Sequence, residues 1–473
     1  MSALWTAAEI IAATGGTAAS AGWSVNGVSI DSRTVAAGDL FVALAGPSFD
    51  GHDFIADALK RGAAGALVSH KPAGVAADAP LILVSDTLAA LTELGRAGRA
   101  RSKARVIAVT GSVGKTGTKE ALRRALERQG STVASAASLN NHWGVPLSLA
   151  RMPADTAYGV FEIGMNHPGE IAALTRLVQP HVAIITTISP AHIGFFPSVE
   201  AIADAKGEIF QGMPRDGVAV LNRDNPHFER LAAAARACGL ARILGFGEHA
   251  DAAVRLIDCH LYSTASAITA MVADEIVDYC LSLPGRHWVI NSLAVMAAVR
   301  AADADISIAA AVMGSLEALD GRGRRHRIAV AGGEADLVDE SYNANPDSMR
   351  AALSVLGTIV PRPGGRRIAV LGDMLELGEA ASILHADLAH PVVAAGVDLV
   401  FTVGREMENL DRALPASRRG GHAAKSSELV PTLTAALRPG DVVMVKGSLG
   451  SRMAEIVKPL LKGAREAALA AKA

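Results

Sequence analysis

The chain has 473 residues, more than a single hydrophobic core accommodates, and this length indicates about three domains. Its 45 basic and 47 acidic residues give a net charge of −2, which offers no argument for nucleic acid or an anionic membrane as a partner. The three cysteines lack metal-ligand spacing and are odd in number, so a reducing cytoplasm is the expected location. The sequence contains no run of about 18 uncharged apolar residues, and its N-terminus resembles an amphipathic helix rather than a signal peptide.

In chain order, three α/β units are expected. Residues 1–104 alternate strand-like pieces (VSIDSR, DLFVALA, ALVSH, LILVS) with helical stretches and end in a helix predicted over Thr87–Ala104. In residues 105–320, strands such as STVAS, GVFEIG, VAIITTI, GVAVLN and RILGFG alternate with helices, which predicts a parallel sheet covered by helices. A basic, Gly-rich stretch (GRGRRHR) then opens residues 321–473, where DLVDES, RIAVLGDM, LVFTVG and DVVMVKGS are further predicted strands. The linkers between these units, near residues 105 and 320, are the predicted hinges.

The segment VIAVTGSVGKTGT, which begins at residue 106, predicts a phosphate-binding loop between a buried strand and a helix. Gly111 and Gly114 bracket a tight turn, whose backbone N–H groups and helix N-terminus suit a polyphosphate. Lys115 would contact the β- and γ-phosphates and Thr116 a magnesium ion. Val109 stands where the usual pattern has its first glycine, so the loop is a variant, and an ordinary strand–helix turn is the alternative. The expected nucleotide-binding residues of the loop are Thr110, Gly111, Ser112, Val113, Gly114, Lys115, Thr116 and Gly117.

Several polar residues follow predicted strands of the central unit, at the sheet edge where open α/β sheets bind ligands. Glu162 interrupts an apolar strand, and beside a phosphate-binding loop magnesium ligation is favoured over a buried ion pair. His192 follows another strand, and Lys206 lies on a predicted helix; taken singly, each has a structural explanation, for Lys206 that of a surface lysine. Asn291 could contact an adenine edge or only backbone, and Arg322 could hold a phosphate or belong to a solvated basic patch.

Two Asn-rich turns also stand out. Asn140 and Asn141 precede a Gly-Val-Pro turn, while Asn343 and Asn345 precede Pro346 at a predicted helix start. Asn is favoured in turns and at helix N-caps, so a structural role is an alternative to substrate binding for both pairs.

Together these segments resemble the Mur ligase family over most of the chain. SIDSRTVAAGDLFVALAGPSFDGHDFI is similar to the family's uridine-nucleotide domain, and VTGSVGKTGTKE to its nucleotide loop. EIGMNHPGEI, AHIGFF and AKGEIF resemble its metal and lysine motifs, and LPGRHWVINSLAV its adenine-side loop. DESYNANPDSM, LGDMLELGE followed by His385, and VKGS at 445–448 are typical of the member that adds a dipeptide rather than one amino acid. Asp339–Glu340 replaces a common Asp-Asp pair, and the Ser189–Pro190 turn is often Gly-containing in relatives.

The resemblance implies three domains: 1–104 for the UDP-sugar peptide, 105–320 for ATP, and a Rossmann-like 321–473 for the incoming amine. The implied reaction, with ATP and Mg²⁺, joins D-alanyl-D-alanine to UDP-N-acetylmuramoyl-tripeptide through an acyl phosphate, in peptidoglycan precursor synthesis. A cytoplasmic monomer is expected, with neither nucleic-acid binding nor membrane insertion. The alternatives are a family member that adds a single amino acid, a folate polyglutamate synthase, a P-loop NTPase switch, and a nucleotide-sugar-binding protein without turnover.

The resemblance also assigns roles to individual residues. Asn291 and Arg322 match the adenine and γ-phosphate contacts, and either Asp339 or Glu340 serves the nucleotide. The implied catalytic residues are Lys115, His192, Lys206 and Arg322. The implied metal ligands are Thr116, Glu162, His192 and Lys206, the last as a carbamate. The implied substrate-binding residues are Ser29, Ser32, Arg33, Asp50, Gly51, His52, Asn141, Asn343 and Asn345.

Overall fold

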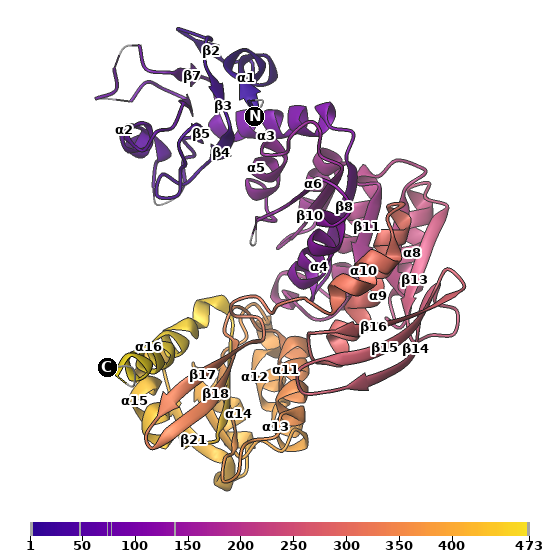
Figure 1. Ribbon diagram of the computed structural model, residues 1–473, viewed down its shortest axis with the longest axis vertical. Helices are drawn as coiled ribbons and strands as arrows, with labels where there is room; N and C mark the ends of the chain where they lie inside the picture. Colours follow the sequence, from indigo (N-terminus) through magenta and orange to yellow (C-terminus); the bar gives the residue numbers. More distant parts are fainter. Residues whose placement is uncertain (1–2, 47–48, 73, 77, 137–138, 471–473) are drawn as a thin grey trace.

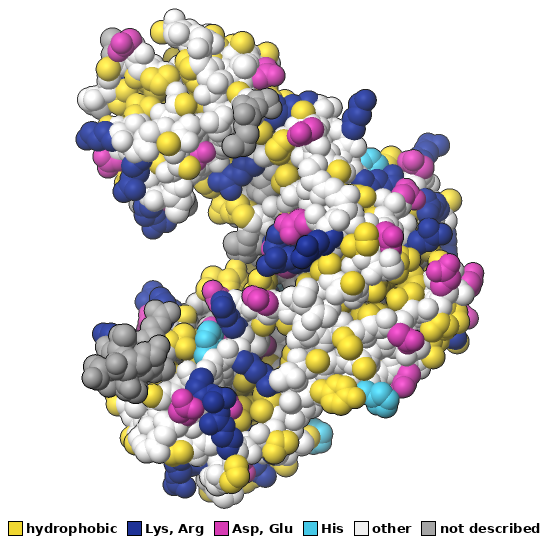
Figure 2. All heavy atoms as spheres, in the orientation of Figure 1, with side chains coloured by type: hydrophobic (Ala, Val, Ile, Leu, Met, Phe, Trp, Pro, Cys, Tyr) yellow, Lys and Arg dark blue, Asp and Glu magenta, His cyan; other side chains and the backbone are white. Residues whose placement is uncertain are grey.

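The computed structural model describes residues 3–46, 49–72, 74–76, 78–136 and 139–470. It shows three α/β units, each built around its own large sheet, arranged along a curve with the chain termini in the two outer units (Figure 1). A broad hollow separates the N-terminal unit from the third unit, and the central unit joins them (Figure 2). None of the described helices combines the length and apolar character needed to cross a bilayer.

The N-terminal unit contains a five-stranded sheet in the order β2-β7-β6-β5-β4, parallel except for β2. A separate antiparallel pair, β1 and β3, lies beside it. The strands are β1 (Trp5–Thr6), β2 (Thr17–Ala18), β3 (Ser24–Val25), β4 (Gly27–Ser29), β5 (Asp39–Val42), β6 (Gly65–Val68) and β7 (Leu81–Leu83). The helices are α1 (Ala7–Thr14), η1 (Gly51–Phe54), α2 (Ile55–Lys60) and α3 (Thr87–Arg101). Helix α3 begins where the sequence predicts, after the N-cap Asp86, and ends three residues earlier, at Arg101.

The central unit has a nine-stranded sheet in the order β16-β15-β14-β13-β12-β11-β8-β10-β9. Strands β8 to β14 are all parallel, as predicted, while β14, β15 and β16 form an antiparallel meander at one edge. The strands are β8 (Arg105–Thr110), β9 (Thr132–Ala134), β10 (Tyr158–Glu162), β11 (Val182–Ile185), β12 (Val218–Asn222), β13 (Arg242–Gly247), β14 (Val254–Leu261), β15 (Ser266–Val272) and β16 (Glu275–Leu281). The helices are α4 (Lys115–Glu127), α5 (Gly144–Ala150), α6 (Glu170–Val178), η2 (Ile193–Phe195), α7 (Val199–Gly207), η3 (Glu208–Gly212), α8 (Phe228–Ala237), α9 (Arg286–Ala301) and α10 (Ile306–Met313).

The third unit has a six-stranded sheet in the order β17-β18-β22-β19-β20-β21, parallel except for β17. The strands are β17 (Arg324–Val330), β18 (Gly333–Glu340), β19 (Arg367–Gly372), β20 (Leu399–Val403), β21 (Arg419–Ala423) and β22 (Val442–Lys446). The helices are α11 (Pro346–Thr358), η4 (Gly378–Ala380), α12 (Ala381–Ala386), α13 (Ala389–Ala394), α14 (Met407–Ala413), η5 (Ala416–Arg418), α15 (Ser426–Ala436), η6 (Leu449–Ser451) and α16 (Ala454–Ala470). Strand β17 occupies the basic stretch that the sequence indicates only as a boundary, and its Arg327 pairs with Glu334 and Asp336 of β18.

The junction between the N-terminal and central units is closely packed. A Cβ at Gly98 of α3 would lie 2.3 Å from the carbonyl oxygen of Leu149 in α5, so only glycine allows this approach. The Trp5 indole donates a 2.7 Å hydrogen bond to the carbonyl oxygen of Ala150, and the Arg101 guanidinium stacks 3.4 Å above the indole ring. These contacts oppose rotation at residue 105, where the sequence predicts a hinge.

Candidate active site

A cleft of about 410 Å³ lies between the central and third units. The central unit supplies the loop between β8 and α4, the end of β10, the start of η2 and the start of α9 (Figure 1). The third unit supplies residues 340–345 after β18 and residues 446–450 after β22. All of these segments lie at the carboxyl ends of parallel strands or at helix N-termini, where open α/β sheets place their ligand sites.

The loop between β8 and α4 has the geometry of a phosphate cradle. Gly111 has φ 144° and Gly114, the N-cap of α4, has φ 89°, both in the region that favours glycine. A Cβ at Gly111 would lie 1.9 Å from the Thr186 hydroxyl, which donates to the carbonyl oxygen of Val113 at 2.5 Å. Lys115 folds over the loop and donates to the carbonyl oxygen of Gly111 at 2.8 Å. Burial lowers the pKa of the Lys115 ammonium, and nearby Glu162 opposes this shift.

Glu162 is the centre of a buried hydrogen-bond cluster, with 2% of its surface exposed. Its carboxylate accepts from the Thr116 hydroxyl at 2.8 Å and from the Asn140 side-chain amide at 2.7 Å, and its backbone N–H donates to the Ser135 hydroxyl at 2.9 Å. A carboxylate paired with a loop threonine supports the predicted magnesium position, since both supply hard oxygen ligands.

The structure brings Asn140, rather than Asn141, to this carboxylate. The Asn141 side chain accepts from the Gly144 backbone N–H at 3.0 Å, at the start of α5, and does not line the cleft. The sequence prediction selected Asn141 as the substrate contact. The two residues are chemically identical neighbours, so only the path of the backbone distinguishes them.

His192 and Lys206 lie near the same point. Burial and the charges of Lys115 and Lys206 lower the pKa of His192, while Glu376 of the third unit, hydrogen-bonded to its Nδ1, raises it. Lys206 in α7 is only 2% exposed, so its interpretation as a surface lysine is wrong. Its ammonium has no hydrogen-bond or ion-pair partner within the described ranges, and burial lowers its pKa well below the usual value. An ammonium here would repel a bound cation, whereas a neutral or carbamylated Lys206 would not, so these residues fit a cation site when Lys206 has lost its positive charge.

On the third-unit side of the cleft, Glu340 and Asp339 have different environments. Asp339 is buried, and its carboxylate accepts from the backbone N–H groups of Gly321 at 3.1 Å and Ser341 at 3.0 Å. Glu340 lines the cleft, and its carboxylate lies 3.0 Å from the Lys446 ammonium. Asp339 therefore shapes the turn, and Glu340 is the one of the pair that faces the cleft.

Three further predicted residues line the cleft, namely Asn291, Arg322 and Asn343. Arg322 stacks 4.2 Å above the Tyr342 ring, which holds the guanidinium without satisfying its donors. Asn345 also lines the cleft, but its side chain caps α11 by accepting from the Ser348 N–H at 2.9 Å. The structural alternative therefore applies to Asn345.

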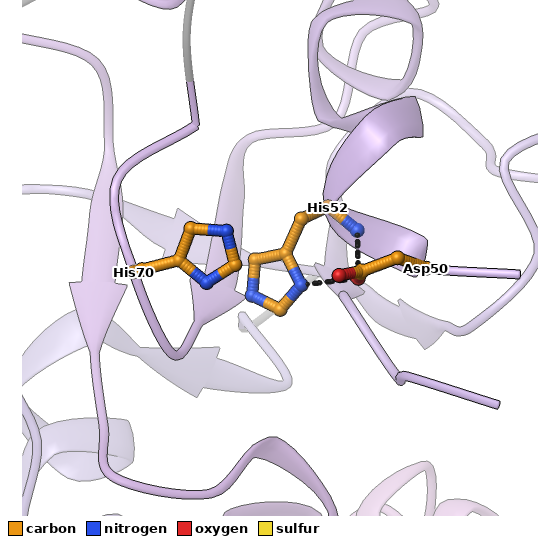
Figure 3. A group of neighbouring side chains, drawn as sticks. All are labelled: Asp50, His52 and His70. Carbon is orange, nitrogen blue, oxygen red and sulfur yellow. Dashed lines mark hydrogen bonds and ion pairs between the residues drawn. The ribbon is translucent and has the colours of Figure 1, made fainter.

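The predicted substrate residues of the N-terminal unit lie outside this cleft. Figure 3 shows the Nδ1 atom of His52 bonded to the Asp50 carboxylate, and the two atoms are 2.6 Å apart. The other ring nitrogen, Nε2, accepts from the Ser69 N–H at 2.9 Å. His70 stacks on the His52 ring with centroids 4.1 Å apart. Although donor atoms of Asp50, His52 and His70 lie within 4.8 Å of one another, the engaged His52 nitrogens make this group a loop brace rather than a metal centre. The other residues of this unit that are predicted to bind substrate also lie outside the cleft; they are Ser29, Ser32, Arg33 and Gly51.

Three family models match successive parts of the chain: the Mur ligase family catalytic domain over residues 24–99, the middle domain over 109–299 and the glutamate ligase domain over 323–449. A curated relative from Escherichia coli (strain K12), UDP-N-acetylmuramoyl-tripeptide–D-alanyl-D-alanine ligase, is 36% identical to this chain. The alignment covers 92% of this chain and 94% of the relative. The chain belongs to the Mur ligase family. Relatives with the same name from Rickettsia prowazekii and Bacillus subtilis are 34% and 32% identical, over 91% and 93% of this chain and 94% and 93% of their own.

Solved structures of the Mur ligase family agree with the fold. A crystal structure of MurF from Acinetobacter baumannii superposes with a TM-score of 0.83 at 30% identity, covering 97% of this chain and 99% of that one. MurF from Thermotoga maritima in complex with ADP gives a TM-score of 0.76 at 26% identity, over 93% and 98% of the two chains. The predicted three-unit α/β fold is therefore confirmed.

The two walls of the cleft combine complementary charges. The central wall is lined by Lys115 and by the Glu162 carboxylate, and the buried Lys206 lies close enough to Lys115 for their charges to interact. This wall suits a polyanion with a divalent cation. The third-unit wall carries the Glu340–Lys446 pair, and Lys446 also donates to the carbonyl oxygen of Asn343 at 3.1 Å. A reaction between a phosphorylated group held on one wall and an amine held on the other fits this arrangement.

Proposed function

We propose that the chain is the ligase that joins D-alanyl-D-alanine to UDP-N-acetylmuramoyl-tripeptide, with conversion of ATP to ADP and phosphate. The observation that carries this proposal is the name shared by the Escherichia coli, Rickettsia prowazekii and Bacillus subtilis relatives, each matched over more than 90% of both chains. The product is the UDP-linked pentapeptide precursor of peptidoglycan, made in the cytoplasm and needed for cell-wall growth, cell shape and division.

The proposed division of labour follows the three units. Residues 1–104 bind the UDP-sugar peptide, residues 105–320 bind ATP, and residues 321–473 receive the dipeptide. The cleft between the last two supports this division, because the phosphate cradle and the Glu340–Lys446 pair face each other across it. Asn343 and the loop at 372–379 are the proposed dipeptide contacts, while Asn345 is left out because its side chain caps α11.

The chemistry explains why ATP is needed. A carboxylate does not accept an amine in water, because its leaving group would be oxide. Transfer of the γ-phosphoryl group to the carboxylate oxygen breaks the phosphoanhydride bond, releases ADP and gives an acyl phosphate with a good leaving group. Lys115 and Arg322 would hold the transferring phosphoryl group by charge and position. Thr116 and Glu162 would hold one Mg²⁺, and His192 with a carbamylated Lys206 would hold a second metal ion. These ions would supply positive charge to offset the negative charges of ATP and of the attacking carboxylate.

The second step is attack of the dipeptide amine on the acyl carbon. It passes through a tetrahedral oxyanion, which the Lys115 and Arg322 cations would stabilise, and phosphate leaves as the amide forms. Acyl phosphates hydrolyse readily, so water must be excluded from the cleft during this step.

The burial of Lys206 supports its carbamylation. Burial favours the neutral amine, whose nitrogen lone pair can attack the carbon of CO₂. A nitrogen–carbon bond forms as one C–O π bond of CO₂ opens, one proton leaves the nitrogen, and the neutral amine becomes an anionic carbamate whose oxygens can act as ligands. The change replaces the repulsion between Lys206 and Lys115 by attraction.

The test measures phosphate release from ATP in the presence of Mg²⁺ and UDP-N-acetylmuramoyl-tripeptide, with and without D-alanyl-D-alanine. Release that needs both substrates, with a pentapeptide product by mass, supports the proposal. Release with the UDP-peptide and a single amino acid would move the chain to another member of the family. Release that is indifferent to both substrates would favour an NTPase switch.

A further inference from the structure

One contact across the cleft links the predicted metal site to the third unit. His192 of the central unit is hydrogen-bonded through Nδ1 to the Oε2 atom of Glu376, which lies between β19 and η4. His192 is one-quarter exposed and Glu376 about two-fifths exposed, at 26% and 41% of their side-chain surfaces. The pair therefore lies at the rim of the cleft, and both residues line it.

The backbone fixes this contact. The N–H of Gly194 donates to the carbonyl oxygen of Glu376 at 2.9 Å, and a Cβ at Gly194 would lie 2.9 Å from the nitrogen of Gly378. Ile193 packs against the hydrophobic core of the third unit as well as that of the central unit. Residues 192–194 and 376–378 thus form a seam between the units, and Glu376 is held opposite His192 by more than its own side chain.

The pairing determines which nitrogen of His192 is free. A carboxylate accepts hydrogen bonds, so the proton of the imidazole must lie on Nδ1. The lone pair of Nε2 is then available for a cation. Metal-binding histidines commonly have a carboxylate on the other ring nitrogen, which fixes the tautomer, orients the ring and strengthens the nitrogen as a ligand.

We propose that Glu376 is a positioning residue that orients His192 as a metal ligand, so that the third unit completes the metal site when it seats against the central unit. The inference rests on the proposed function of His192 as a metal ligand. It explains why a loop of the dipeptide-receiving unit reaches this histidine: the site for phosphoryl transfer is complete only when the amine-receiving wall is in place.

A simpler explanation is that the pair only holds the two units together. The two explanations differ in what Glu376 removal changes. Loss of a structural contact would loosen the units without acting specifically on the cation, whereas loss of an orienting carboxylate weakens metal binding through His192 alone.

The experiment is a titration of the full chain with Mn²⁺ in the presence of ADP, followed by the electron paramagnetic resonance signal of free Mn²⁺. Glu376→Ala is expected to weaken one Mn²⁺ site by about 10- to 100-fold, the usual effect of losing the partner of a metal-binding histidine. Glu376→Gln retains an oxygen that accepts from Nδ1–H and should recover much of this loss. Glu379→Ala, which removes an exposed carboxylate three residues away, is the matched control and should bind Mn²⁺ like the wild type.

Two results would overturn the proposal. One is wild-type Mn²⁺ affinity in Glu376→Ala. The other is an additive loss when Glu376→Ala is combined with His192→Ala, because a residue that acts through His192 has no further effect once the imidazole is gone. The titration contains neither peptide substrate, so its failure is distinguishable from failure of the ligase assignment, which the phosphate-release assay decides.

Discussion

Replacing Lys206 by methionine should stabilise the protein while abolishing ligation. Lys206 is 2% exposed, its ammonium has no hydrogen-bond or ion-pair partner in the described part of the chain, and Lys115 adds like-charge repulsion. Methionine retains most of the buried stem without the charge. Burial of an ion costs several kcal/mol, and an apolar residue of similar size in place of buried ionic groups commonly gains 1–4 kcal/mol. We therefore expect Lys206→Met to raise the free energy of unfolding by about 2–4 kcal/mol at pH 7.

The increase in unfolding free energy caused by Lys206→Met should become smaller as the pH rises. The pKa of folded Lys206 is lowered, so the folded state binds fewer protons than the unfolded state between the two pKa values. The cost of burying the lysine is therefore full below the folded pKa, falls as the pH rises through the interval, and disappears above the pKa of an unfolded lysine, about 10.4. The stability advantage of Lys206→Met should be largest below the folded pKa of Lys206 and should fade as the pH approaches the pKa of an unfolded lysine.

The assay is urea unfolding of wild type and variant in CO₂-free buffer and again with bicarbonate. In CO₂-free buffer the variant should unfold at higher urea. With bicarbonate, carbamylation would turn the wild-type lysine into an anion attracted to Lys115, so the difference should shrink, and no such change should occur in the variant. Equal free energies of unfolding without CO₂ would refute the argument from burial, and a difference insensitive to bicarbonate would refute carbamylation.

The other predictions concern the cradle, the seam and the third-unit core. Lys115→Ala should lower substrate-dependent phosphate release by at least about 10²-fold with an unchanged circular dichroism spectrum, and wild-type turnover would contradict the assignment of the cradle. Gly194→Ala places a Cβ 2.9 Å from the nitrogen of Gly378, so the seam must open and the linker near residue 320 should be cut faster in limited proteolysis. Asp441→Ala leaves the Arg366 guanidinium, paired with it at 2.7 Å, without its fully buried carboxylate. It should lower the unfolding free energy of the third unit by about 3–5 kcal/mol, measured by urea denaturation.

The elements that the sequence predicted share a strong local signal. Buried parallel strands are continuous apolar runs, and the β8–α4 loop has its strand, glycines, Lys-Thr pair and helix in the order of a phosphate-binding loop, so both are recognisable without tertiary information. The strands missed in the third unit, β17 and β21, are the two edge strands. Strand β17 begins with the basic residues RRHR, and its pairing depends on acids of β18 that lie several residues away in sequence.

The candidate site was predictable in its chemistry but not in its contacts between units. Glu162, His192 and Lys206 each had a structural alternative. Only the fold shows that Lys206 is buried within charge range of His192, without a hydrogen-bond or ion-pair partner among the described residues. The contact between His192 and Glu376 spans 184 residues of sequence, and no spacing or periodicity links two such positions. A ligase whose phosphate cradle and amine-receiving wall lie in different units needs contacts of this kind, because a signal confined to one unit cannot report where another unit lies.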